Sequence, residues 1–356
     1  MNNIARIQQK LCENGLDALL ILDEKNQRFA AGFPFTDGAV LVGREKAWLL
    51  TDSRYIEAAE KIAGGCCEVR LFDKEHPMMG QLQALVQRCG EAVGAEEESL
   101  SHARWAAFEK RLGCPLRPAQ AMLRTLRASK TEEEIRSMIR AQRVSEKALA
   151  EVLPLIKPGM TEREVMAELV YHMLKNGSEG NSFDPIVVTG ANTSMPHGVP
   201  GDAVIRAGDF VTMDFGSLCG GYCSDMTRTV AVGYATEEMK TVYYTVLEAQ
   251  LAGIAAARSG VSGKLIDKAA RDVIEKAGYG PYFGHGFGHS LGLDIHEAPN
   301  ANPRGEAPMA LNDVCSAEPG IYLPGKFGVR IEDVMVIRPE GAEVITKAPK
   351  SELIVL

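Results

Sequence analysis

Two aspartates lie close together in the stretch VTMDFGSLCGGYCSDMTRTVAVG (211–233). Residues alternate in character on both sides of Gly220-Gly221, and a Gly-Gly pair permits the positive φ angles of a two-residue hairpin turn. With this turn, residue 216 faces residue 225, so Asp214 and Asp225 become diagonal cross-strand neighbours with backbones about 5.5–8 Å apart. Two inward carboxylates among apolar side chains repel each other and lose hydration, and a bound cation would relieve both penalties. The alternative is that one aspartate lies on a solvated edge.

Histidines form a second group. Of the seven in the chain, His285, His289 and His296 fall within GHGFGHSLGLDIHE (284–297). The interleaved glycines exclude a regular helix and let the backbone run close to an ion or a substrate. The segment matches neither H-E-x-x-H nor G-x-G-x-x-G, so neither a zincin nor a dinucleotide site is indicated. Three clustered histidines favour metal binding over ordinary packing, and His197 in a turn-rich loop could approach the same centre.

Two glutamates lie in or beside strand-like runs further along the chain, Glu318 in CSAEPGIY and Glu332 in FGVRIEDVMVI. Because side chains alternate along a strand, Glu332 shares a face with Arg330 while Ile331 points away. Most glutamates are surface charges. The value of these two lies in their match to the aspartate hairpin.

An internal repeat explains that match. Residues 158–177 and 259–278 align without a gap, each with a helix N-cap (Thr161 or Ser262), apolar residues at matching turns and a closing glycine. This part of the chain is therefore expected to contain two similar halves, each with two helices followed by strands. Such pseudo-symmetry favours a site on the axis, built by both halves.

The first part of the chain alternates strand-like runs (17–22, 38–43, 47–51) with helical ones (53–63, 78–90, 102–113). That alternation predicts a small α/β domain. From about residue 122, LRTLRASKTEEEIRSM is basic and then offers a Ser/Thr cap followed by three glutamates, which marks a boundary. We therefore place an α/β N-terminal domain at 1–124 and an α+β domain at 125–356.

Composition limits the function classes. The chain of 356 residues is 46% hydrophobic and 24% charged, which is typical of a globular protein. A net charge of −8 without a block of like charges argues against a nucleic-acid partner. The N-terminus lacks the h-region of a signal peptide, and no apolar run is long enough for a membrane span, so a cytoplasmic protein is expected.

The eight cysteines include no C-x-x-C pair and are expected to be reduced. Buried small hydrophobes is the preferred interpretation, although Cys66–Cys67 and Cys219–Cys223 could be ligands or redox switches.

Five motifs together resemble the pita-bread metallopeptidases, the family of methionine aminopeptidase, aminopeptidase P, prolidase and creatinase. They occur in family order, and the likeness extends over nearly the whole chain. The motifs are MDFG with Asp214, SDMTRT with Asp225, HGFGHSLGLDIHE with His289, AEPGIY with Glu318 and VRIEDV with Glu332. The size of the N-terminal domain and its segment TDSRYIEAAEK (51–61) are similar to the aminopeptidase P, prolidase and creatinase branch.

The resemblance implies a creatinase/prolidase-like N-terminal domain and a pita-bread catalytic domain. It implies that the five motif residues bind two divalent metal ions, with Asp225 and Glu332 bridging them, and that the protein is a homodimer. Mn²⁺ is the expected metal and Co²⁺ the other that the family favours. The hard ligand set fits Mn²⁺ without excluding Zn²⁺ or iron. The matching positions also imply substrate or proton handling by His197, His285, His296 and Glu318, and a supporting, substrate-binding role for Tyr322 and Arg330.

The implied activity is metal-assisted hydrolysis of peptides with proline at the second position, releasing the N-terminal residue. The alternative is a prolidase that cleaves only Xaa-Pro dipeptides. A non-catalytic binding module and a creatinase-type C–N hydrolase are less consistent with an intact ligand set. A dipeptidase needs a cation for the substrate carboxylate, and Arg330 or Arg54 could supply it. Since no dedicated cation is evident, the aminopeptidase is preferred.

Overall fold

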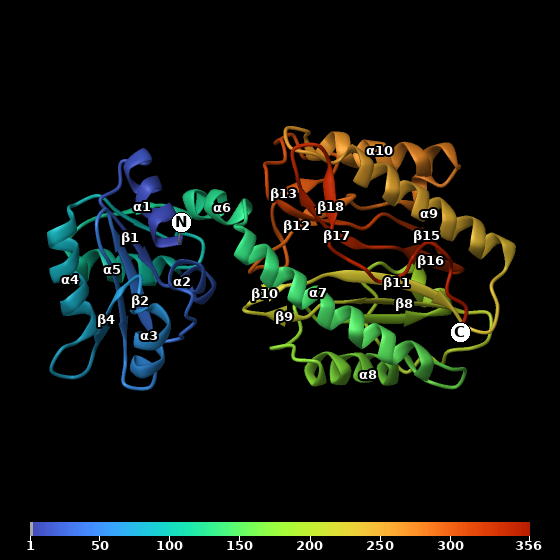
Figure 1. The fold of residues 1–356 in the computed structure, drawn as a ribbon, viewed down its shortest axis with the longest axis horizontal. Helices are drawn as coiled ribbons and strands as arrows, with labels where there is room; N and C mark the ends of the chain where they lie inside the picture. The colour runs from blue at the N-terminus through green and yellow to red at the C-terminus, as the bar shows by residue number, and fades with distance from the viewer. Residues whose placement is uncertain (1–2) are drawn as a thin grey trace. The chain divides into compact units, whose positions relative to one another are not determined.

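The computed structural model describes residues 3–356. They form two compact units, one ending at Arg127 and one extending from Ala128 to Leu356 (Figure 1). Each unit contains its own sheets and its own hydrophobic core.

The first unit is an α/β domain, as the sequence predicted. Its strands are β1 (Ala18–Ile21), β2 (Gly38–Gly43), β3 (Ala47–Thr51), β4 (Glu68–Leu71), β5 (Val93–Ala95) and β6 (Leu116–Pro118). Its helices are α1 (Asn3–Glu13), α2 (Glu24–Ala31), α3 (Ile56–Ala63), α4 (Met78–Cys89), α5 (His102–Leu112) and α6 (Gln120–Ala128), the last of which ends just beyond the unit. The strands form one mixed sheet with the order β4-β3-β2-β1-β5-β6.

All the strands and helices predicted in this unit are present, with ends shifted by a few residues. The helix expected at 53–63 begins only at Ile56, because the side chain of Asp52 accepts the backbone N–H of Arg54 and holds a turn there. Burial on both faces of β1, β2 and β3 explains why their sequences are continuous apolar runs.

The second unit consists of two halves that repeat one pattern. The first half contains α7 (Glu132–Val152), η1 (Leu153–Leu155), α8 (Glu162–Lys175), β7 (Ile186–Thr189), η2 (Gly190–Ser194), β8 (Phe210–Phe215), β9 (Leu218–Cys219), β10 (Tyr222–Cys223) and β11 (Met226–Ala231). The second half contains α9 (Glu237–Ala256), α10 (Gly263–Lys276), η3 (Gly280–Tyr282), β12 (Gly288–Ser290), β13 (Glu297–Ala301), β14 (Val314–Ala317), β15 (Gly320–Leu323), β16 (Phe327–Arg330), β17 (Asp333–Ile337) and β18 (Ala342–Val344).

Two antiparallel sheets occupy the middle of this unit, with the orders β11-β8-β7 and β13-β12-β14-β17-β18. The hairpins β9–β10 and β15–β16 form two small sheets of their own. In Figure 1, α7 and α8 cover one side of the strands and α9 and α10 the other. Each half therefore contains a helix pair followed by strands, with a small hairpin between β8 and β11 in the first half and between β14 and β17 in the second, which confirms the repeat.

Helix caps explain where the paired helices begin. Thr131 caps α7 and Thr161 caps α8, each in a reciprocal capping box with the glutamate three residues later. Ser262 occupies the N-cap position of α10, but its side chain makes no capping hydrogen bond, so the expected equivalence to Thr161 holds for position only.

All eight cysteines are free thiols. Cys67, Cys223 and Cys315 are buried, as expected of small hydrophobes, whereas Cys12 is exposed and the other four are partly exposed. The prediction of burial was therefore wrong for most of them. Within residues 3–356, no helix is both long and apolar enough to cross a membrane.

Candidate metal centre

The aspartate hairpin has the register that its glycines predicted. Tyr222 pairs with Cys219 across the turn in the small sheet, and Thr227 pairs with Asp214 in the same register in the adjoining β8–β11 pair. Gly220 and Gly221 both have positive φ angles, 61° and 75°, which the tight turn requires. Asp214 and Asp225 are thus diagonal neighbours on the two strands, and both are buried.

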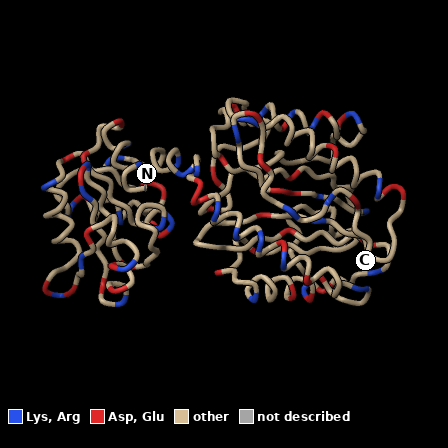
Figure 2. Tube along the Cα trace, in the orientation of Figure 1, with Lys and Arg blue, Asp and Glu red and all other residues tan. Residues whose placement is uncertain are grey.

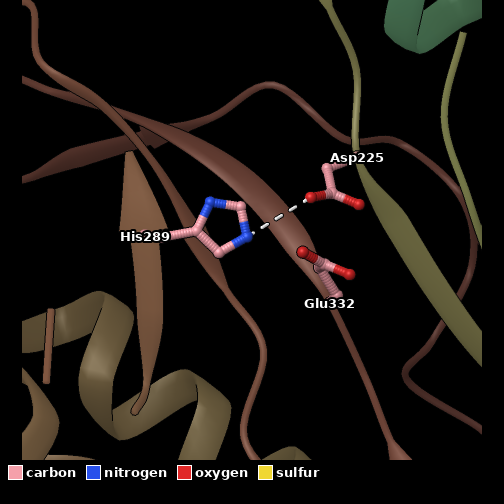
Figure 3. Close-up of side chains that lie close together, drawn as sticks. All are labelled: Asp225, His289 and Glu332. Carbon is pink, nitrogen blue, oxygen red and sulfur yellow. Dashed lines mark ion pairs between the residues drawn. The ribbon is translucent and has the colours of Figure 1, made fainter. Parts of the chain in front are cut away.

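Three side chains from separate segments meet beside this hairpin. Asp225 lies directly before β11, His289 on β12 and Glu332 directly before β17. One ligand atom from each of the three lies within 4.8 Å of the other two. Figure 3 shows the imidazole of His289 beside both carboxylates, with its Nε2 3.6 Å from Oδ2 of Asp225. Asp225 and Glu332 take equivalent places in the two halves, each just before the last strand of the repeated pattern.

Neighbouring groups fix which nitrogen of His289 is available. Its Nδ1 lies 3.2 Å from the carbonyl oxygen of Ser290, and a carbonyl can only accept, so Nδ1 carries the proton. Nε2 is then unprotonated and able to act as a ligand, and it also lies 3.3 Å from Oε1 of Glu318. The hydroxyl of Ser316 donates to the same Oε1 at 3.0 Å and accepts the backbone N–H of His289 at 3.0 Å. One serine therefore holds the side chain of Glu318 and the backbone of His289.

The electrostatics of the centre are those of crowded, dehydrated carboxylates. Burial raises the pKa of Asp225 well above its usual value, and the negative charges of Asp214 and Glu318 raise it further. The pKa of Glu332 is raised for the same reasons, by burial first and then by Asp225, Glu318 and Asp214. Burial lowers the pKa of His289, which favours the neutral imidazole that can act as a ligand.

Asp214 lies outside the three-residue group and is held by Arg330. Nη2 of Arg330 donates to Oδ2 of Asp214 at 2.6 Å, while Nε of the same arginine donates to Oγ1 of Thr227 at 3.0 Å. That threonine hydroxyl in turn donates to Oε2 of Glu332 at 2.7 Å. Arg330 therefore orients two of the expected ligands, one directly and one through Thr227.

The donor set fits a divalent cation. Among residues 3–356, Oδ1 of Asp214 and Oε1 of Glu332 are buried and have no hydrogen-bond partner. A buried carboxylate oxygen without a partner is costly, and a cation is the group that best satisfies it. Carboxylate oxygens with one imidazole also form the hard set that such ions prefer.

A chain of hydrogen bonds runs away from the centre through Tyr322. Nη1 of Arg330 donates to the Tyr322 hydroxyl at 3.0 Å, and that hydroxyl lies 2.8 Å from Nε2 of His285. Since Nδ1 of His285 faces the carbonyl of Gly286 at 2.9 Å, the tyrosine O–H must donate to Nε2. Burial raises the pKa of Tyr322 to about 12, so the phenol keeps its proton.

The two remaining predicted histidines are exposed. The ring of His296 lies 4.3 Å from that of His289, centre to centre, and partial burial together with this neighbour lowers its pKa. His197 follows Pro196, whose carbonyl accepts from Nη1 of Arg330 at 3.2 Å. Burial lowers the pKa of His285, and the charge of His197 makes a smaller contribution in the same direction to the pKa values of His285 and His296.

Figure 2 shows acidic and basic residues along the central strands of this unit as well as on its rim. Charged side chains are almost never fully buried unless they are paired or bind a ligand.

Sequence reasoning missed Thr227 and Ser316, which hold Glu332 and Glu318. Each lies two residues from a predicted ligand on the same strand face (Asp225 or Glu318), so the period-two pattern was the signal that could have found them.

Comparisons with known proteins agree with this geometry. Residues 136–339 match the model of metallopeptidase family M24, and residues 3–129 match the creatinase/prolidase N-terminal domain. An uncharacterised peptidase of Bacillus subtilis is 38% identical over 96% of this chain and 96% of its own length.

Two solved structures are similar over the whole chain. The Xaa-Pro dipeptidase from Bacillus anthracis is 40% identical with a TM-score of 0.94, covering 99% of both chains. The X-Pro aminopeptidase from Thermotoga maritima is 36% identical with a TM-score of 0.90, covering 100% of both. With its creatinase/prolidase N-terminal domain and its buried cluster of carboxylates and histidine, the chain belongs to metallopeptidase family M24 and is a hydrolase of peptides.

Proposed function

We propose that this protein is an Xaa-Pro aminopeptidase, which releases the first residue of a peptide whose second residue is proline. The observation that carries the proposal is the convergence of Asp225, His289 and Glu332 within 4.8 Å, with buried carboxylate oxygens that have no hydrogen-bond partner within residues 3–356. The full-length similarity to Xaa-Pro peptidases supports the substrate class. A prolidase that accepts only dipeptides is the second candidate, favoured by the similarity to the Bacillus anthracis dipeptidase.

We propose that the centre binds two divalent ions. Asp225 and Glu332 would bridge them, because the two halves place these carboxylates equivalently. Asp214, His289 and Glu318 would complete the set. Mn²⁺ is the expected metal, with Co²⁺ or Zn²⁺ as alternatives, since four carboxylates to one imidazole is a hard ligand set.

When bound, the ions supply Lewis-acid activation of water and of the peptide carbonyl. Glu318, held by the Ser316 hydroxyl, is positioned to take the proton of the attacking water on a carboxylate oxygen. His296 is exposed and packs edge-on against His289, so a ring nitrogen of His296 can hydrogen-bond the substrate carbonyl as negative charge develops there. His197 is equally accessible to substrate.

His285 acts differently in this proposal. Both of its nitrogens have protein partners, so His285 would hold the Tyr322 hydroxyl from one side while Arg330 holds it from the other. Tyr322 and Arg330 would therefore shape the substrate pocket. We also propose, from the family resemblance, that the protein is a cytoplasmic homodimer.

Metal analysis and a peptide assay test these statements together. Protein loaded with Mn²⁺ and freed of excess ion should contain close to two equivalents per chain and should cleave an Xaa-Pro-Yaa peptide. A plateau well below one equivalent would contradict the two-ion centre. Full metal loading without cleavage of any Xaa-Pro peptide would instead favour a non-catalytic binding module.

A further inference from the structure

Arg228, one residue beyond Thr227 on β11, is among the largest fully buried side chains. Its guanidinium has five N–H groups, and all five are used. Nη1 donates to the carbonyls of Thr227 at 2.9 Å and Glu332 at 2.6 Å. Nη2 donates to Oδ1 of Asp333 at 2.8 Å. Arg228 therefore ties β11 to the start of β17, next to the proposed bridging carboxylates of both halves.

The remaining acceptors of Arg228 come from the C-terminal tail. Nη2 also donates to the carbonyl of Ala348 at 2.8 Å, and Nε donates to that of Pro349 at 3.1 Å. The match to the family model ends at residue 339, so this tail lies beyond the segment that identifies the family. It nevertheless completes the coordination of a buried arginine behind the metal centre.

Lys350 closes the same cluster. Its ammonium group donates to Oδ2 of Asp333 and, at 2.5 Å, to Oε1 of Gln250. The Asp333 side chain is 1% exposed and that of Lys350 16%, so the pair is largely removed from water. Asp333 therefore lies between two cations, Arg228 on one oxygen and Lys350 on the other.

Gln250 lies on α9 and is fully buried. Besides accepting from Lys350, its side-chain amide binds the backbone at two further positions. Its Nε2 donates to the carbonyl of Ala317 at 2.9 Å and to that of Ile331 at 3.2 Å. These residues directly precede Glu318 and Glu332. The amide can hold both carbonyls only while its oxygen faces the other way, and Lys350 is the donor that fixes that orientation.

We propose that Lys350 is a positioning residue for the metal centre. Through Gln250, and through Asp333 and Arg228, it fixes the backbone that carries Glu318 and Glu332. It touches none of the proposed ligand side chains in these contacts, so it acts by orienting them. Partners one step removed from a metal typically change its affinity about 10- to 100-fold. This inference rests on the proposed metal centre but not on which peptides are cleaved.

The test uses the full-length, metal-free protein and Mn²⁺ alone as the probe, with free Mn²⁺ measured by electron paramagnetic resonance. Lys350→Met should raise the dissociation constant for Mn²⁺ about 10- to 100-fold. The matched control is Lys347→Met in the same tail, where the lysine is exposed and its ammonium group contacts only the carbonyl of Val344, at 3.3 Å, among residues 3–356. That variant should stay within about twofold of the unsubstituted protein. Lys350→Arg, which keeps a cation, should recover part of the affinity.

Two further measurements separate positioning from a general loss of stability. Saturating Mn²⁺ should return the kcat of Lys350→Met towards that of the unsubstituted protein, which a misfolded variant would not show. If Lys350→Met does not fold, Gln250→Met removes the two carbonyl contacts while preserving shape, and the same loss of affinity is expected. A Mn²⁺ dissociation constant within twofold of the unsubstituted protein, in a folded Lys350→Met or Gln250→Met variant, overturns the proposal. Failure to cleave Xaa-Pro peptides with normal Mn²⁺ binding would overturn the proposed function alone.

Discussion

Nη2 of Arg330 donates to Oδ2 of Asp214 at 2.6 Å, and the other oxygen of that aspartate, Oδ1, is buried without a partner among residues 3–356. The arginine thus orients the carboxylate and leaves one oxygen facing the centre. Four carboxylates and one guanidinium still carry a net negative charge. A buried charge of that sign is relieved either by protonation, which the raised pKa values of Asp225 and Glu332 favour, or by a bound cation.

The first prediction concerns the proposed bridge. Asp225→Asn keeps the size of the side chain and removes a charge shared by both ions, so kcat/KM should fall by more than about 100-fold. Without metal, the variant should unfold at the same temperature or a higher one, because the neutral amide escapes the burial penalty and the repulsion by Asp214 and Glu318 that raise the pKa of Asp225. Peptide assays and calorimetry of the metal-free protein check both expectations. Near-normal turnover in the fully metallated variant would mean that the bridge is misassigned.

The second prediction separates a metal ligand from a substrate contact. His289→Ala removes the nitrogen that faces Asp225 and Glu318, so metal content should fall. His296→Ala removes only an exposed ring that packs edge-on against His289, so metal should be retained while kcat falls about 10²–10³-fold through loss of one transition-state hydrogen bond. Elemental analysis beside steady-state kinetics distinguishes the two. Equal metal loss in both variants would contradict these roles.

The third prediction concerns the first unit and its pH dependence. Glu96 is buried and accepts hydrogen bonds from the backbone N–H groups of Leu22 and Asp23 and from the side chain of Asn26. Burial nevertheless raises its pKa. Because the pKa of Glu96 is higher in the folded protein than in the unfolded chain, the group stabilises the fold. This stabilisation is fully present below the unfolded-state pKa of about 4.3 and is lost as pH rises through the folded-state pKa.

Glu96→Gln should remove that loss, so the unfolding free energy of the variant relative to the unsubstituted protein should rise with pH above about 4.3. The test compares how the unfolding free energy of the two proteins changes with pH, and not its absolute value. The glutamine amide replaces one hydrogen-bond acceptor by a donor, and that change affects the variant at every pH. Both tryptophans, Trp48 and Trp105, lie in the first unit, so tryptophan fluorescence in urea reports this unit. Parallel pH curves for the two proteins would contradict the assignment.

Local features of the chain could be predicted because their causes are local. Gly220 and Gly221 set the hairpin register, and Thr131 with the glutamates after it set the start of α7. The network around Arg228 could not be predicted, since its acceptors include backbone carbonyls more than a hundred residues away, which have no side-chain pattern. The prediction that the cysteines are buried was wrong for most of them because a small side chain such as that of Cys12 fits both in a core and on a surface.

The last prediction distinguishes the aminopeptidase from the prolidase. Both need a free amino terminus with proline next to it, and they differ in the group that the proline carbonyl carries, a terminal carboxylate or a further peptide bond. A dipeptidase must bind the proline carboxylate, for which an arginine is well suited. Arg330 is already committed to Asp214, Thr227, Tyr322 and the carbonyl of Pro196. It has too few unused N–H groups for a bidentate contact with substrate.

Arg54, the other arginine considered, pairs with Asp52 and Asp37 within the first unit. We therefore expect release of the first residue from Xaa-Pro-Yaa tripeptides and longer peptides in the presence of Mn²⁺, measured by chromatography of the products. N-acetylated peptides and peptides with alanine in place of proline are the controls, and both should be cleaved far more slowly. Cleavage confined to Xaa-Pro dipeptides, with the longer peptides intact under the same metal conditions, would show that the protein is a prolidase.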